Sequence, residues 1–184
     1  SVVGGERFGR YSFIGLPART RLRASGFRTE VVSEGRVVET HEGNPLDFID
    51  QYQKRFKVAL RPGLPRFCGG LAGYFGYDAV RYIEPKLAQT WKDGGVDTPD
   101  ILLLQCEELA VIDNLSGRLY LIVWADPARA DAYALALQRL AELAEKLRHS
   151  VNAPAVERGP VHPVVRDFAK ADLLSAVEQA KAYI

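Results

Sequence analysis

An arginine with serine and glycine residues lies near the start of the chain, where such groups could bind a small zwitterion. The guanidinium group of Arg10 can form paired hydrogen bonds with a carboxylate, and a serine hydroxyl beside it can bind an amine. Gly4 and Gly5 favour a loop before the apolar segment 11–16. Arginine and serine are common on protein surfaces, however, so this pattern by itself does not identify a site.

Two acidic residues near the middle of the chain raise the question of a catalytic acid and base. General acid–base catalysis needs two carboxyl groups held in a cleft with separated pKa values. Here Arg81 lies between Asp78 and Glu84, at steps that match one helical turn. We therefore expect local ion pairs in this segment and no catalytic pair.

The glycine-rich segment before these charges could be mistaken for a phosphate-binding loop. Its glycines lack the spacing of the dinucleotide-binding fingerprint, and neither Lys-Ser nor Lys-Thr follows them. Aromatic residues are interleaved with the glycines instead. We predict a strand in which the missing side chains let a neighbouring backbone approach closely. The glycines are Gly69, Gly70, Gly73 and Gly76, and the aromatics are Phe67, Tyr74, Phe75 and Tyr77.

The cysteines and histidines do not form a metal-binding pattern. Cys68 and Cys106 each lie in an apolar stretch without a partner at ligand spacing, which predicts buried, reduced thiols in a cytoplasmic protein. His41, His149 and His162 are scattered through polar segments, and we expect all three on the surface. The sequence predicts no metal site in this chain.

Bulk composition indicates a globular protein. The chain has 184 residues, of which 47% are hydrophobic and 26% charged, enough for one domain with a core. A formal net charge of +1 gives no electrostatic argument for nucleic acid or an anionic membrane as a partner. No apolar run approaches the roughly 18–20 residues that span a bilayer, and the first residues do not resemble a signal peptide.

Short segments that alternate polar and apolar residues predict antiparallel strands. The segments 19–24, 27–32 and 36–40 are separated by turn residues, which predicts an antiparallel meander with one solvent-exposed face. We expect one long, mostly buried strand over 101–112 and a returning strand over 118–124. The predicted fold class is α+β, a largely antiparallel sheet flanked by helices.

Two helices should accompany these strands. Asn44 as N-cap and Pro45 at the first position begin one helix, and Asp126-Pro127 begins another by the same logic. Glu142 and Lys146 are spaced to form a supporting ion pair. The expected apolar stripes are Ile49, Tyr52 and Phe56 in the first helix and Tyr133, Leu137, Leu140, Ala144 and Leu147 in the second.

The final segments indicate that more polypeptide belongs with this sequence. The region 152–163 contains three prolines and a glycine and is interpreted as a linker. Apolar residues then recur at helical spacing from Phe168 to Ile184 without a closing glycine, asparagine or proline. Because the chain also contains no methionine, we expect it to be a piece of a longer protein.

Two motifs give the chain a resemblance to a known family. Arg-Tyr-Ser-Phe-Ile-Gly (10–15) and the glycine–aromatic segment 69–84 resemble the amino-terminal part of anthranilate synthase component I, the large subunit. The resemblance implies the N-terminal part of the chorismate-utilising enzyme fold. It divides the chain into a regulatory domain (1–150), a linker (151–163) and the truncated start of the chorismate-binding catalytic domain (164–184).

The resemblance also implies a regulatory site. In the family a Leu-Leu-Glu-Ser motif lines the pocket where L-tryptophan binds as an inhibitor. Ser1 takes the place of the motif's serine, although the Leu-Leu-Glu is absent, and Arg10 falls near a basic residue of the same pocket. The family's catalytic residues lie beyond position 184, so the resemblance implies no catalytic residue in this chain.

The implied reaction belongs to the full-length protein, which would convert chorismate and ammonia to anthranilate and pyruvate in tryptophan biosynthesis. Ammonia would come from a partner glutamine amidotransferase subunit, and Mg²⁺ would bind in the missing catalytic domain. One alternative is aminodeoxychorismate synthase component I of the folate pathway. The intact 10–15 motif favours anthranilate synthase over this alternative. Another is a non-catalytic small-molecule-binding module.

Overall fold

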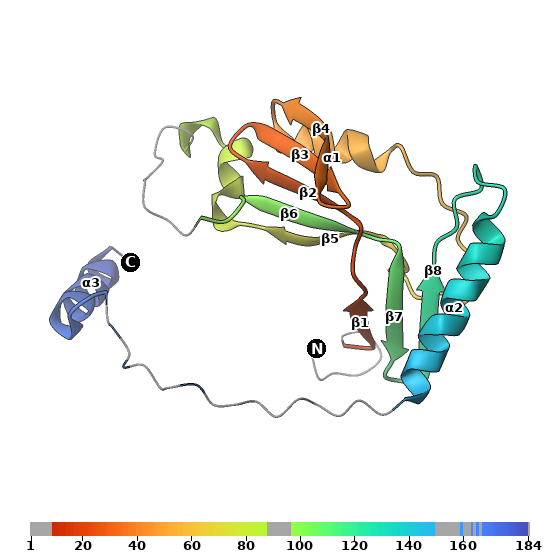
Figure 1. The fold of residues 1–184 in the computed structure, drawn as a ribbon. Helices are drawn as coiled ribbons and strands as arrows, with labels where there is room; N and C mark the ends of the chain where they lie inside the picture. The colour runs from red at the N-terminus through yellow and green to blue at the C-terminus, as the bar shows by residue number, and fades with distance from the viewer. Residues whose placement is uncertain are drawn as a thin grey trace. The chain divides into compact units, whose positions relative to one another are not determined.

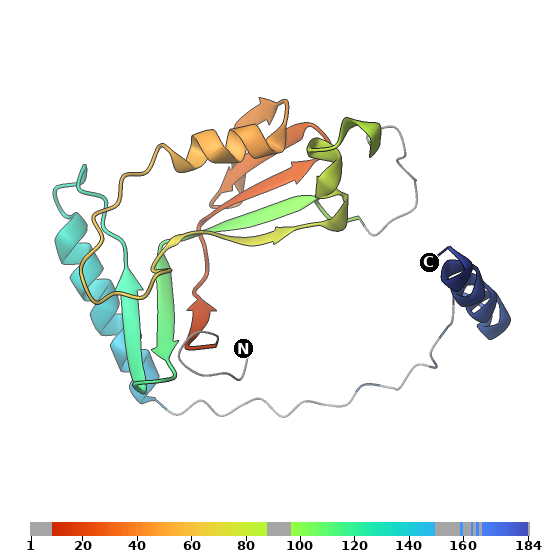
Figure 2. The same cartoon turned by 180° about the vertical axis from the view of Figure 1, so that it is seen from behind.

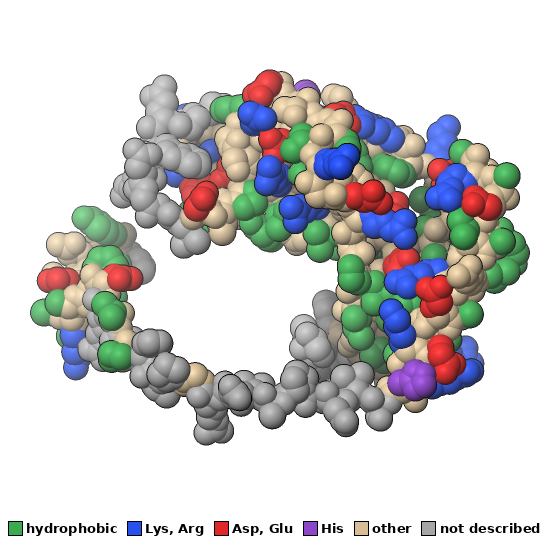
Figure 3. Space-filling view, in the orientation of Figure 1, with side chains coloured by type: hydrophobic (Ala, Val, Ile, Leu, Met, Phe, Trp, Pro, Cys, Tyr) green, Lys and Arg blue, Asp and Glu red, His purple; other side chains and the backbone are tan. Residues whose placement is uncertain are grey.

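The computed structural model describes residues 9–87, 97–149, 159, 163, 165 and 167–183. The chain divides into two compact units, residues 1–149 and 150–184. The first unit contains two antiparallel sheets, each accompanied by a helix (Figure 1). Basic and acidic side chains are interspersed over the face of this unit that Figure 3 presents. The predicted α+β class with largely antiparallel strands is confirmed.

The larger sheet has five strands in the order β4-β3-β2-β6-β5. The meander that the sequence predicted supplies β2 (Thr20–Ser25), β3 (Arg28–Ser33) and β4 (Arg36–Glu42), joined by tight turns. The glycine-rich segment supplies β5 (Gly70–Phe75), and β6 (Ile101–Cys106) lies between β2 and β5. Each neighbouring pair is antiparallel.

The smaller sheet has three strands in the order β1-β7-β8. They are β1 (Tyr11–Gly15), β7 (Glu108–Asp113) and β8 (Arg118–Val123), again all antiparallel. The two edge strands thus come from opposite ends of the unit's sequence, and β7 pairs with both. This arrangement brings the residues before β1 next to the turn between β7 and β8.

The expected single strand over 101–112 is wrong, because the chain changes sheets at Glu107. Residues before it pair with β2 and β5, and residues after it pair with β1 and β8. The Glu107 carbonyl accepts a hydrogen bond from the Trp124 amide at 2.9 Å, which ties the junction to the end of β8. A nearly continuous apolar run does not show where a strand exchanges partners, since those partners are set by distant segments.

Helix α1 (Pro45–Gln53) begins as predicted, with the Asn44 side chain accepting a hydrogen bond from the Leu46 amide at 3.0 Å. The helix lies against the five-stranded sheet (Figures 1 and 2). Ile49 and Tyr52 are buried there, whereas Phe56 lies beyond the helix end and is half exposed. The core beneath α1 consists of Leu22, Ala24, Val31, Phe48, Ile49, Tyr52, Ala79, Ile101 and Leu103.

Helix α2 (Ala132–Arg148) packs on β8 but begins later than predicted. The Asp126 carboxylate accepts a hydrogen bond from the Ala128 amide at 2.9 Å and so caps a preceding turn instead of the helix. The buried positions are Ala132 and Leu143, so the expected stripe is also displaced. Of that stripe, Tyr133, Leu137 and Leu147 are exposed.

One of the predicted helical ion pairs in the first unit is found, and another forms with a different partner. Asp78 and Arg81 form a salt bridge at 2.8 Å, as predicted, within the 3-10 helix Tyr77–Tyr82. A further 3-10 turn covers Pro85–Leu87. On α2, Glu142 pairs with Arg139 at 3.1 Å, where we had expected Lys146.

The second unit is described mainly by helix α3 (Lys170–Ala182), which confirms the helix predicted near the end of the chain. The large apolar side chains Leu173, Leu174 and Val177 are exposed on it. Most of the predicted linker 152–163 lies outside the described residues.

The cysteine prediction is confirmed, since Cys68 and Cys106 are buried free thiols, and burial raises the pKa of each thiol. His149 is exposed, as expected. His41 keeps part of its surface exposed, and its ring stacks on the Phe48 ring of α1 with the centroids 4.9 Å apart. His162 lies outside the described residues.

Thr29 in β3 has a buried hydroxyl that lacks a hydrogen-bond partner among the described residues. Burying a hydroxyl unpaired costs free energy, and valine has nearly the same shape without it. Thr29→Val should therefore raise the free energy of unfolding by about 1 kcal/mol in urea titrations. In contrast, Thr20→Val on the neighbouring strand should lower it, because the Thr20 hydroxyl hydrogen-bonds that of Ser33 at 3.1 Å. A destabilised Thr29→Val variant would contradict the prediction.

Candidate functional site

Of the two residues predicted to bind a regulator, Ser1 and Arg10, the structure describes only Arg10. Ser1 lies outside the described residues, so its place in a binding site stays a prediction. Arg10 is described and lies directly before β1, at the edge of the three-stranded sheet. The described part of the candidate site consists of Arg10 and its neighbours.

Arg10 forms a two-point ion pair with Asp113, the last residue of β7. Its Nε lies 3.1 Å from Oδ1 and its Nη2 lies 2.9 Å from Oδ2. The Asp113 side chain is 2% exposed, whereas the Arg10 side chain is 39% exposed. Hydrogen bonding from Arg10 holds the pKa of the Asp113 carboxyl well below its usual range. The carboxylate is thus an internal anchor, and the guanidinium reaches the surface.

The Arg10 guanidinium retains hydrogen-bonding capacity. Only Nε and Nη2 are used on Asp113, and within the described part of the chain Nη1 has no hydrogen-bond partner. The group also lies over the Tyr11 ring, 4.9 Å from its centroid, which holds its plane by a cation–π contact. A carboxylate could bind the free donors of this fixed guanidinium.

Asn114 fixes the backbone around Arg10. Its amide donates to the Arg10 carbonyl at 2.7 Å, and its side-chain Nδ2 donates to the Gly9 carbonyl at 3.0 Å. The same Nδ2 lies 3.1 Å from the Ser12 hydroxyl oxygen. The segment 9–12 is therefore hydrogen-bonded to the β7–β8 turn at several points.

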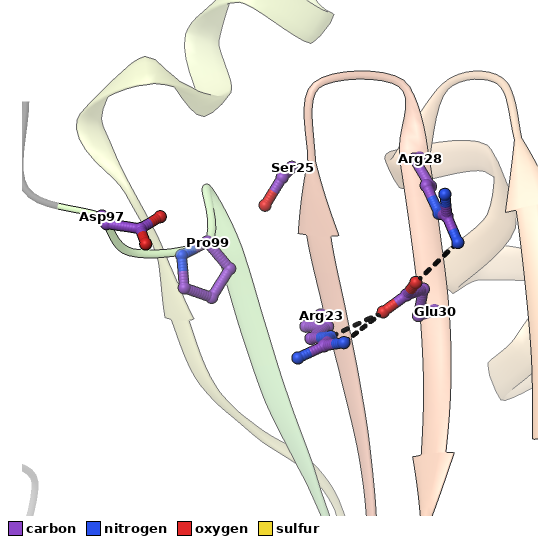
Figure 4. A pocket seen from close by; sticks show the side chains of 6 residues that line it. All are labelled: Arg23, Ser25, Arg28, Glu30, Asp97 and Pro99. Carbon is purple, nitrogen blue, oxygen red and sulfur yellow. Dashed lines mark hydrogen bonds and ion pairs between the residues drawn. The ribbon is translucent and has the colours of Figure 1, made fainter. Parts of the chain in front are cut away.

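A second charged surface lies on the face of the five-stranded sheet opposite α1 (Figure 4). Arg23 and Arg28 both pair with Glu30, at 2.6 and 2.9 Å, beside a shallow hollow of about 500 Å³. Ser25, Asp97 and Pro99 line the rest of the hollow. Because both guanidinium groups already pair with a carboxylate, we interpret this cluster as a structural ion-pair network on an exposed sheet face.

The described residues contain neither a metal-binding cluster nor a helix that could span a membrane. No three His, Cys, Asp or Glu side chains of the described residues are placed to hold a metal ion. The described helices are too short or too polar to cross a bilayer. The Mg²⁺ of the predicted full-length enzyme therefore has no candidate ligand set in the described residues.

The sequence did not predict the roles of Asp113 and Asn114, which lie between the expected strands 101–112 and 118–124. An Asp-Asn pair followed by Leu-Ser-Gly signals a turn in which the aspartate bonds its own backbone. It does not signal a partner 103 residues away in the chain. Only the pairing of β1 with β7 brings Arg10 to this turn.

Comparisons with known proteins identify the family. No family model matches the chain. It is 48% identical over its whole length to anthranilate synthase component 1 of Neisseria meningitidis serogroup C, and 42% identical to that of Pseudomonas putida. In both cases it spans 38% of the relative's length. The whole chain also matches the crystal structure of anthranilate synthase component I from Streptococcus pneumoniae, with a TM-score of 0.68 at 22% identity. The match covers 40% of the Streptococcus pneumoniae chain.

The structural match shows a shared fold, and the sequence matches extend from the first residue to the last. The resemblance that the 10–15 and 69–84 motifs indicated is thereby confirmed. The chain belongs to the anthranilate synthase component I family and corresponds to the N-terminal part of its members.

Proposed function

We propose that this chain is the tryptophan-sensing, regulatory part of an anthranilate synthase component I. The observation that carries the proposal is the 48% identity to an anthranilate synthase component 1 across all of this chain. The exposed, anchored Arg10 supports it, because a fixed guanidinium suits recognition of an amino-acid carboxylate. Ser1 would supply a hydroxyl at the same site.

The reaction of the whole protein would be the conversion of chorismate and ammonia to anthranilate and pyruvate. Ammonia would derive from glutamine on a partner amidotransferase subunit. Mg²⁺, when bound in the part of the protein beyond this chain, would supply charge compensation for chorismate carboxylate. We assign no catalytic residue to this chain, whose part would be to bind the inhibitor and hold its site in shape.

Inhibition at a distance requires that tryptophan bind the less active arrangement of the enzyme more tightly than the active one. Contacts from this chain can provide such a difference only if Arg10 and Ser1 meet the ligand differently in the two arrangements. Because Arg10 is anchored to Asp113, this chain would offer the ligand a recognition group in a fixed orientation.

Isothermal titration calorimetry on the full-length protein tests the site. Tryptophan should bind the parent protein, and Ser1→Ala and Arg10→Ala should each weaken binding by about tenfold or more, because each removes a hydrogen bond to a charged ligand. Arg36→Ala is the matched control, since Arg36 is an exposed arginine in β4. A parent protein that does not bind tryptophan would refute the proposed function, and unchanged affinity in a variant would remove that residue from the site.

A further inference from the structure

The turn between β7 and β8 holds both the side chain and the backbone of the segment that carries the predicted regulator site. Within this turn, the Asp113 carboxylate first fixes its own loop: Oδ1 accepts from the Leu115 amide at 3.1 Å and lies 3.4 Å from the Ser116 amide. The Gly117 amide donates to the Asp113 carbonyl at 2.8 Å and closes the turn. The bonds within the turn thus hold the carboxylate in place independently of Arg10.

Asp113 then meets Arg10 through both carboxylate oxygens. Two parallel hydrogen bonds fix the plane of the guanidinium as well as its position. Because Asp113 is buried and Arg10 is partly exposed, a ligand could reach Arg10 but not Asp113. Any influence of Asp113 on such a ligand must therefore act through Arg10.

Asn114 provides the second half of this arrangement. Its three hydrogen bonds hold the backbone carbonyls of Gly9 and Arg10 and the side-chain hydroxyl of Ser12. Among the described residues, strand β1 is an edge strand that pairs only with β7, so these bonds are a substantial part of what orders Gly9 and Arg10 before it. Asn114 itself is exposed and lies away from the core.

We propose that Asp113 and Asn114 are positioning residues that preorganise Arg10 for the regulator, which makes the β7–β8 turn part of the inhibitor-sensing device. The inference rests on the proposed function, because it assigns these residues to the same site. A guanidinium held in one orientation loses less conformational freedom when it binds a carboxylate than a free one does. Releasing Arg10 should therefore weaken tryptophan binding even though Arg10 itself remains.

The test is a double-mutant cycle on the full-length protein, with tryptophan affinity measured by calorimetry and folding monitored by thermal unfolding. Asp113→Asn keeps the shape of the side chain but replaces one acceptor oxygen by a donor, so the two-point contact is lost. We expect this variant to bind tryptophan about tenfold more weakly. In an Arg10→Ala background the same substitution should change the affinity by less than about twofold, since the residue that it positions is gone.

Two further variants keep the test decisive. Asp126→Asn, the matched control, alters another turn-capping aspartate away from the segment and should leave the affinity unchanged. Asn114→Ala removes exposed hydrogen bonds only, so it should fold, and it should weaken binding about threefold or more. It answers the question if Asp113→Asn fails to fold.

The outcomes separate this inference from the proposed function. Wild-type affinity in a folded Asp113→Asn or Asn114→Ala variant would overturn the positioning role while tryptophan binding by the parent stands. An equal loss of affinity in the wild-type and Arg10→Ala backgrounds would also overturn it, because Asp113 would then act on structure in general. A parent protein without tryptophan binding would instead refute the proposed function.

Discussion

Replacing Gly73 with alanine is expected to destabilise the first unit by about 3 kcal/mol, because strand β5 has no room for a side chain at this position. A methyl group built at Gly73 would overlap the carbonyl oxygen of Leu102 and crowd the Cα of Leu103 in the paired strand. These are backbone atoms within a hydrogen-bonded ladder, so relief requires a shift of the strand itself. Such a shift would also disturb the pairing of β6 with β2.

A second strand glycine provides the control for this prediction. A methyl group at Gly15, the last residue of β1, would meet no atom within 4 Å. Gly15→Ala should therefore unfold at nearly the parent's urea concentration or slightly above it, since alanine also reduces the entropy of the unfolded chain. Equal urea midpoints for the Gly73→Ala and Gly15→Ala variants would show that the close strand approach is not what Gly73 provides.

Removing the Leu103 side chain should have an effect of similar or greater size. Leu103 in β6 is 4% exposed and faces the core beneath α1, so Leu103→Ala leaves a cavity and should cost about 2–5 kcal/mol. Its neighbour Leu104 is 38% exposed on the opposite face of the same strand. Leu104→Ala should cost only about 1 kcal/mol, because little buried contact is lost.

The pair of leucine variants compares the same substitution at adjacent positions, so differences in residue type or strand propensity cancel. Urea titrations of the 184-residue chain, followed by far-ultraviolet circular dichroism, would measure both free energies of unfolding. If Leu104→Ala were the more damaging of the two, the assignment of the faces of β6 would be wrong. That result would also undermine the core assigned to the five-stranded sheet.

Local features of this protein could be predicted because neighbouring residues determine them. The meander over 19–40 follows from alternation and turn residues, and the start of α1 follows from the Asn44-Pro45 pair. The close approach at Gly73 followed from the absence of a side chain at that position. The family itself followed from two motifs that the comparisons confirmed.

The structure decided features that depend on distant partners. The exchange of sheets at Glu107 could not be predicted, because a uniformly apolar run is compatible with several strand pairings. The buried face of α2 could not be predicted either, because a helix with apolar residues on more than one face can pack in several ways. The anchoring of Arg10 by Asp113 is the clearest case: the sequence supplied both charges, and each has many opposite charges available to it. Only the antiparallel register of β1 with β7 places these two side chains within hydrogen-bond distance. Register is set by the faces that a sheet buries and by the turns that join its strands, and no short turn joins β1 to β7, so no local pattern specifies this pairing.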